Sequence, residues 1–195
     1  VPDYTILDRP EVLTTLFHPR PEPAYRATEA GHDVVIPVTT DHAIGGRWHM
    51  GPAGGPNILF FHGNGEIVAD YDELGPLYNS LGINLMAVDY RGYGRSSGSP
   101  SVSGMMMDCH AILRFSETWL KRNNYSGPLI VMGRSLGSAS ALELAANHPD
   151  RIDGLILESG FAFAAPLLRL LGVDPDRIVF DESAGFANLE KIRHY

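Results

Sequence analysis

The sequence predicts an α/β protein whose core is a mostly parallel sheet with helices on both faces. Three observations support this prediction. The chain has 195 residues, which is the size of one domain. From Asn57 onward, short apolar runs alternate strictly with segments of helical periodicity, as in parallel sheets. Glycine-rich polar motifs follow two of these runs directly, at the strand ends where such sheets carry their chemistry.

The residues before this core predict an irregular arm and two strands. Five prolines within the first 23 residues break up the arm and leave room for one short helix, around residues 11–17. Residues 33–38 and 43–49 have β-like patterns, and the proline- and glycine-rich stretch 51–56 is a turn.

Four short apolar runs predict the buried strands of the core. These runs are residues 58–61, 84–88, 129–132 and 155–157. Between them, apolar residues recur at steps of three and four, which predicts one helical face over 67–81 and another over 102–120. A third helix, rich in small residues, is expected over 135–147.

Composition excludes several classes of function. The net charge of −8 and the absence of a lysine or arginine run argue against a binder of duplex nucleic acid. A single cysteine, Cys109, excludes an internal disulfide framework and a cysteine-based zinc site, and it fits a cytoplasmic location. The histidines show no metal-ligand spacing, and no apolar stretch reaches the roughly 18 residues of a membrane span.

The strongest motif is the stretch Gly133–Gly137, with the sequence Gly-Arg-Ser-Leu-Gly, between an expected strand and an expected helix. A bare match would also suit a serine that caps a helix between loop glycines. The strand before it and the helix after it favour a nucleophile elbow, in which Ser135 stands exposed on a sharp turn. Gly133 and Gly137 lack a Cβ, so that neighbouring backbone can approach the turn closely.

A second motif, His62-Gly63-Asn64-Gly65-Glu66, directly follows the first core strand. A hydrolase that attacks a carbonyl with a serine needs backbone donors for the developing oxyanion. We therefore expect the N–H groups of Asn64 and Leu136 to form the oxyanion hole. The His62 side chain is expected to brace the loop, because in folds with a nucleophile elbow the catalytic base comes later in the chain than the serine.

With these motifs the sequence resembles the serine α/β-hydrolase superfamily, and in particular its small esterase- and thioesterase-like members with a His-Gly-Asn oxyanion loop. The stretches 89–96 and 158–161 also look like this superfamily, and the resemblance covers roughly residues 34–195. It implies that the block from Asp89 to Ser96 is structural and shapes the floor of the pocket. The glycines within that block have the wrong spacing for a dinucleotide-binding loop.

In this fold the chain order of the triad is serine, acid, histidine, and the last two follow later strands. No strand is visible after residue 157, so we expect the last two strands, the acid and the histidine beyond Tyr195. Residues 1–195 alone, a single incomplete domain, are then expected to be inactive. Glu158 and Asp181 are the fallback acids, and His194 is the fallback base.

The stretch 161–183 is too long for a simple crossover and is rich in apolar residues. We interpret it as a small lid over the site, and the alternative is an ordinary helix packed on the sheet.

The favoured function is hydrolysis of a small-molecule carboxylic ester or thioester through an acyl-enzyme on Ser135, with no cofactor. Two alternatives remain open: an acyltransferase on the same scaffold, and a non-catalytic ligand-binding protein that resembles a hydrolase. An aspartate at the elbow would indicate a dehalogenase or an epoxide hydrolase, and the serine disfavours both. The sequence carries no signal for an oligomeric state.

Overall fold

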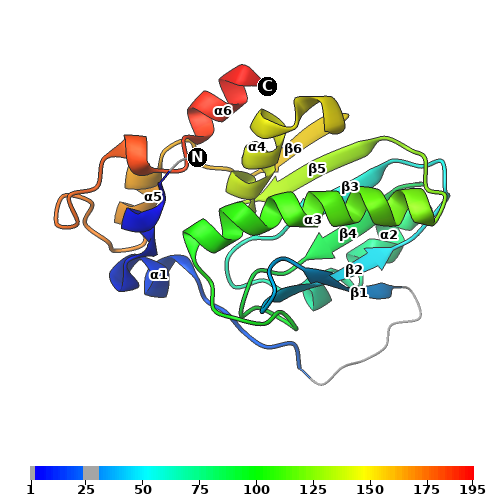
Figure 1. Cartoon of the computed structure of the whole chain (residues 1–195), viewed down its shortest axis with the longest axis horizontal. Coiled ribbons are helices and arrows are strands. Elements are labelled where there is room, and N and C mark those ends of the chain that lie inside the picture. Colours follow the sequence, from blue (N-terminus) through cyan, green and yellow to red (C-terminus); the bar gives the residue numbers. More distant parts are fainter. Residues whose placement is uncertain (1–2, 24–30) are drawn as a thin grey trace.

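Six strands form one sheet in the order β1-β2-β4-β3-β5-β6 in the computed structural model, which describes residues 3–23 and 31–195 (Figure 1). The strands are β1 (His32–Pro37), β2 (Ala43–His49), β3 (Asn57–Phe61), β4 (Asn84–Val88), β5 (Leu129–Arg134) and β6 (Gly154–Glu158). Strand β2 pairs antiparallel with both β1 and β4, and every other pair is parallel. The predicted fold class and the four predicted core strands are confirmed.

Helices cover both faces of this sheet, as predicted. They are α1 (Pro10–Leu16), α2 (Leu74–Ser80), α3 (Val102–Arg122), α4 (Gly137–Asn147), α5 (Ala164–Leu170) and α6 (Asn188–His194). Short 3-10 turns lie at Thr5–Asp8, Val68–Tyr71, Pro149–Arg151 and Glu182–Ala184. None of the helices in the described ranges is long and apolar enough to cross a lipid bilayer.

Alternation along the central strands separates two apolar clusters. In β3, Leu59 and Phe61 belong to the larger cluster, which includes residues of α3 and α4, whereas Ile58 and Phe60 belong to a smaller one on the opposite face. Successive side chains of a strand point to opposite faces, so both faces of a central strand must be apolar. This is why the core strands are continuous apolar runs in the sequence.

The helix predicted over residues 67–81 is interrupted in the structure. A 3-10 turn, Val68–Tyr71, precedes α2, and Pro76 lies within the first turn of α2, where a proline is tolerated. Leu74 and Leu81 are 42% and 70% exposed, so the predicted continuous apolar face is wrong at these two positions. The regular spacing reflected two separate elements rather than one helix.

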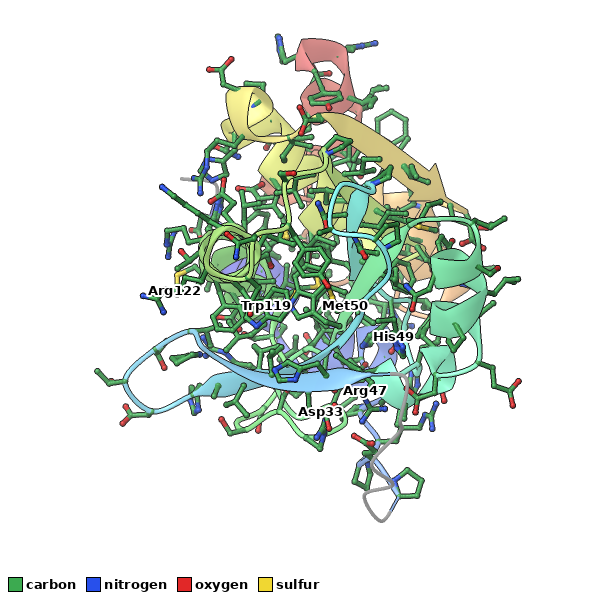
Figure 2. The ribbon with its side chains drawn as sticks, turned by 90° about the vertical axis from the view of Figure 1, so that its right-hand side faces the viewer. Asp33, Arg47, His49, Met50, Trp119 and Arg122 are labelled. Carbon is green, nitrogen blue, oxygen red and sulfur yellow. The ribbon has the colours of Figure 1, made fainter. Side chains whose placement is uncertain are left out.

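A buried arginine joins the antiparallel edge of the sheet to the rest of the molecule. Arg47 is completely buried in β2, and its guanidinium pairs with Asp33 on β1, at 2.6 Å, and with Asp72, also at 2.6 Å. Figure 2 shows Asp33, Arg47 and His49 on this side of the molecule. Desolvation opposes ionisation of Asp33, but hydrogen bonds from Arg95 and Arg47 outweigh it and lower the pKa of Asp33 to about 2.

The stretch 161–183, the predicted lid, contains α5 and lies beyond the carboxyl ends of the parallel strands, next to the N-terminal residues (Figure 1). The Arg9 guanidinium donates a hydrogen bond to the carbonyl of Ile178 at 3.1 Å, and the ring of Phe161 packs edge-on against that of Phe186. Leu168 is buried in the main core, whereas Phe163 is 47% exposed. A lid function for this stretch stays a prediction.

Candidate active site

Ser135 lies on the sharp turn between β5, which ends at Arg134, and α4, which begins at Gly137. Its φ of +49° is in the left-handed region, which non-glycine residues adopt at a cost. The Ser135 N–H donates to the carbonyl of Glu158, at the end of β6, at 2.9 Å. The turn is therefore held from the neighbouring strand, and its strained conformation matches the nucleophile elbow predicted from the sequence.

Two glycines allow the backbone to approach this turn on both sides. A Cβ on Gly133 would lie 2.4 Å from the carbonyl oxygen of Gly137, and one on Gly137 would lie 2.1 Å from that of Phe61. It would also lie 2.8 Å from the carbonyl oxygen of His62. Contacts this short leave no room for a side chain, so glycine is required where the start of α4 meets the end of β3.

The same close approach brings the two predicted oxyanion donors to one end of the sheet. Leu136 directly precedes α4, and Asn64 lies in the loop after β3. Within the described residues, neither backbone N–H donates to another protein group. The N–H of Leu136 lies at the N-terminus of α4, where negative charge is favoured, and the N–H of Asn64 comes from a loop.

The His62 side chain braces the loop that follows β3. It is completely buried, its Nδ1 lies 2.8 Å from the carbonyl oxygen of Gly63, and its Nε2 lies 3.3 Å from Oδ1 of Asp89. The same carboxylate oxygen accepts the N–H of Val68 at 2.9 Å. The structure thus places the His62 ring behind the loop, in the bracing position expected from the sequence.

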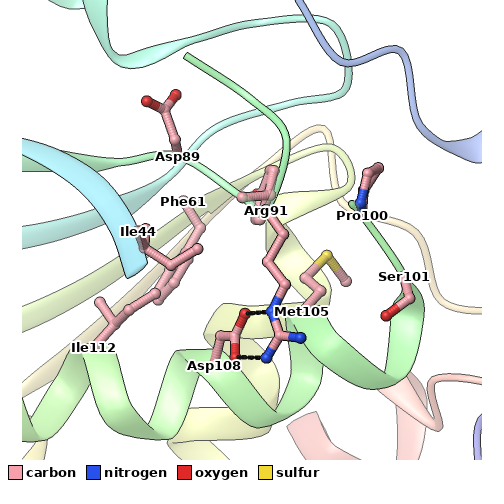
Figure 3. A pocket seen from close by; sticks show the side chains of 10 residues that line it. Ile44, Phe61, Asp89, Arg91, Pro100, Ser101, Met105, Asp108 and Ile112 are labelled. Atoms are coloured by element: carbon pink, nitrogen blue, oxygen red, sulfur yellow. Dashed lines mark hydrogen bonds and ion pairs between the residues drawn. The ribbon is translucent and has the colours of Figure 1, made fainter. Parts of the chain in front are cut away.

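The block that begins at Asp89 orders loops, as the resemblance implied. Figure 3 shows Arg91 and Asp89 pointing in opposite directions among the residues that line a small pocket. The Arg91 guanidinium makes two hydrogen bonds of 2.7 Å to the Asp108 carboxylate on α3. Gly94 packs against Asp89 so closely that a Cβ would lie 2.1 Å from its Oδ2.

The N-terminal arm holds the side chain of Asn64, a contact that sequence analysis missed. The backbone N–H of His18 donates to Oδ1 of Asn64 at 2.8 Å, and the Tyr93 hydroxyl donates to the same oxygen at 2.7 Å. Burial raises the pKa of Tyr93 to about 12, so its hydroxyl stays protonated as a donor. No local pattern in the irregular arm could have indicated this pairing.

The fallback triad residues do not reach Ser135 through their side chains. The Glu158 carboxylate lies 3.4 Å from Nη1 of Arg134, the Asp181 carboxylate accepts the N–H of Ser183 at 2.8 Å, and His194 is exposed at the end of α6. The Ser135 hydroxyl has no hydrogen-bond partner in the ranges 3–23 and 31–195. The same ranges contain no group of three or more potential metal ligands.

The strand order and the elbow together define an α/β hydrolase. The chain belongs to the family described as serine aminopeptidase, S33, whose model matches residues 56–173. This match runs from the start of β3 to beyond α5, and so includes both the oxyanion loop and the elbow.

Comparison with curated proteins gives relatives of varied description. The chain is 35% identical over 113 residues to protein bem46 of Schizosaccharomyces pombe, covering 56% of this chain and 36% of that protein. It is 40% identical over 111 residues to lysophosphatidylserine lipase ABHD12 of Danio rerio, covering 54% and 28%. It is 33% identical over 156 residues to the uncharacterised protein Rv2307c of Mycobacterium tuberculosis, covering 73% and 53%. The chain thus spans between about a quarter and a half of the length of these relatives.

Solved structures share the same fold. A CIB-like hydrolase from Thermoplasma acidophilum is 27% identical with a TM-score of 0.51, and the match covers 67% of this chain and 63% of that chain. A carboxyl esterase from Bacillus coagulans is 20% identical with a TM-score of 0.54, covering 67% and 44%. At such identities the likeness establishes the architecture, and the chemistry has to be argued from the site.

Proposed function

We propose that this chain carries the nucleophile of a serine hydrolase that cleaves a carboxylic ester or thioester through an acyl-enzyme on Ser135. One observation carries the proposal: Ser135 is held at a φ of +49° between β5 and α4, next to the backbone N–H of Leu136, which donates to no protein group in the described part of the chain. A serine that only capped the helix would not require this strained conformation.

In the proposed reaction, Oγ of Ser135 attacks the acyl carbon while a base accepts its proton. The carbonyl oxygen becomes an oxyanion and accepts hydrogen bonds from the N–H groups of Asn64 and Leu136. Collapse of this intermediate expels the alcohol or thiol, which takes up a proton, and leaves the acyl group on Ser135. Water then hydrolyses the acyl-enzyme by the same steps.

The substrate we propose has an apolar acyl chain. The segment 161–183, beyond the carboxyl ends of the strands, presents Phe163, which is 47% exposed, and three apolar side chains that are partly buried against the main core: Phe161, Leu167 and Leu171. Burying one such side chain against an acyl chain is worth about 1.5–3 kcal/mol. The relative ABHD12 is described as a lysophosphatidylserine lipase, a name that denotes a lipid substrate and supports the same class for this site.

The test uses the full-length native product of the gene, since the chain spans only part of its relatives. Wild type, Ser135→Ala and the control Ser140→Ala are compared with p-nitrophenyl butyrate, and acylated protein is trapped for mass spectrometry. Ser140 lies in α4, the helix that follows Ser135, and its buried hydroxyl has no partner in the described part of the chain, so it matches the chemical change.

We expect Ser135→Ala to lower kcat by at least about 10⁴-fold and to abolish the acyl adduct, while Ser140→Ala keeps both. Ester turnover that survives in Ser135→Ala would contradict the proposal. Turnover of aminoacyl p-nitroanilides without ester turnover would replace it with a peptidase activity.

A further inference from the structure

We propose that the Glu66–Arg134 ion pair is a positioning pair, which sets the separation between the two halves of the oxyanion hole. The inference rests on the proposed function of Ser135. The two donors of that hole come from separate segments, one after β3 and one after β5. A side-chain link between these segments therefore controls whether both N–H groups point at the same oxygen.

Glu66 fixes the first segment. Its Oε2 accepts the backbone N–H of Gly63 at 2.7 Å and the hydroxyl of Tyr71 at 2.6 Å. Burial, followed by the hydrogen bond to Glu66, raises the pKa of Tyr71, so the hydroxyl stays protonated as a donor. Because Gly63 directly precedes Asn64, this carboxylate determines the path of the loop at the first oxyanion donor.

Arg134 fixes the second segment and joins it to the first. Its Nε lies 3.2 Å from Oε1 of Glu66, and its Nη1 lies 3.4 Å from Oε1 of Glu158. Arg134 directly precedes Ser135, whose N–H donates to the carbonyl of Glu158. One guanidinium thus links the oxyanion loop, the elbow and the end of β6.

The exposure of the Glu66–Arg134 pair indicates that it contributes to the geometry of the oxyanion hole rather than to the stability of the fold. The side chains of Arg134 and Glu66 are 44% and 26% exposed, and ion pairs that are exposed to this degree contribute little to folding. A displacement of about 1 Å at a reacting centre, in contrast, can reduce the rate about 100-fold. The pair should therefore affect turnover far more than it affects stability.

The experiment compares Glu66→Gln, Arg134→Gln and the double variant in the full-length protein. Glutamine at 66 keeps one oxygen for the N–H of Gly63, and its NH2 group replaces the charged oxygen that faces Arg134. The matched control is the Glu117–Arg151 pair, with side chains 32% and 35% exposed, changed to Glu117→Gln and Arg151→Gln. That pair joins α3 to the turn after α4 and touches neither the oxyanion loop nor the elbow.

We expect each single variant at 66 or 134 to lower kcat about 10- to 100-fold with little change in KM. The double variant should be no slower than the slower single variant, because both remove the same link. Inhibition by a trifluoromethyl ketone, whose adduct places an oxyanion in the hole, should weaken by the same factor as kcat. The control variants should change none of these quantities.

Active-site titration with a fluorophosphonate separates the possible outcomes. The inference would be overturned if Arg134→Gln turned over substrate as fast per titrated site as wild type. It would also be overturned if the effects of the two single substitutions on log kcat were fully additive in the double variant. If wild-type protein is not labelled at Ser135 at all, the proposed function fails and the inference fails with it.

Discussion

Replacing Ser135 by glycine should stabilise the protein relative to alanine, because Ser135 is held in the left-handed region. Its φ is +49°, and an L-residue in that region costs roughly 1–2 kcal/mol. Glycine escapes this cost but loses more chain entropy on folding, by roughly 0.4–1 kcal/mol. The difference leaves Ser135→Gly more stable than Ser135→Ala by about 0.5–1 kcal/mol, although neither variant keeps the nucleophile.

Ser140 supplies the matched control, five residues further along the chain. It lies inside α4 and is completely buried, and its hydroxyl has no partner among the described residues. In a helix, glycine is less favourable than alanine by about 0.8–1 kcal/mol. The stability order of the glycine and alanine variants should therefore invert between positions 135 and 140.

Urea unfolding of the four variants, followed by tryptophan fluorescence, measures the two differences directly. Trp48 and Trp119 stack in the core with ring centroids 4.9 Å apart, so their emission reports on the folded state. In thermal melts, 1 kcal/mol corresponds to about 2–4 °C in a chain of this size. If Ser135→Gly is less stable than Ser135→Ala by the margin found at position 140, the elbow carries no strain and the reasoning is wrong.

Three further predictions concern other parts of the molecule. Asp33 has its pKa lowered to about 2, so it stabilises the fold fully above its unfolded pKa near 3.9 and loses this effect as the pH falls toward 2. The free energy of unfolding of wild type should therefore fall more steeply between pH 4 and pH 2 than that of Asp33→Asn. Equal slopes would contradict this. Lys191→Met should cost about 1.5–3 kcal/mol in urea unfolding, because it removes the cation that lies 2.6 Å from the buried Glu143 carboxylate. The carboxylate keeps hydrogen bonds from Tyr4 and Asn147, and Lys191→Met/Glu143→Gln should recover most of the loss. A cost below about 1 kcal/mol would refute the reasoning. Phe163→Asp should lower kcat/KM for octanoyl relative to acetyl p-nitrophenyl esters, because Phe163 is exposed. Leu168→Asp, in the core, should instead reduce the yield of folded protein. An unchanged acyl preference in Phe163→Asp would show that this segment does not contact the substrate.

The strands and the elbow were predictable because their signals are local. An apolar run buried on both faces, such as residues 84–88, matches β4 residue for residue, and the elbow motif is recognised by the strand before it and the helix after it. The glycines at 133 and 137 meet backbone atoms at distances that exclude a Cβ, so their spacing in the sequence directly reflects a packing constraint.

The remaining features depend on contacts between distant segments, which no local pattern encodes. Glu66 and Arg134 both lie inside recognised motifs, yet their pairing follows only from the order of β3 and β5 in the sheet. The contact of His18 with Asn64 joins an irregular arm to a loop. The spacing of apolar residues over 67–81 predicted a single helix, because this spacing does not reveal that a 3-10 turn ends at Tyr71 and that α2 begins only at Leu74.

The most direct test of the central claim is the site of covalent labelling in the full-length native protein. A fluorophosphonate reacts with an activated serine, and tandem mass spectrometry of the digested protein identifies the modified residue. The account predicts one adduct, on Ser135, which is absent in Ser135→Ala and retained in Ser140→Ala. An adduct on any other serine, or undiminished labelling of Ser135→Ala, would contradict it.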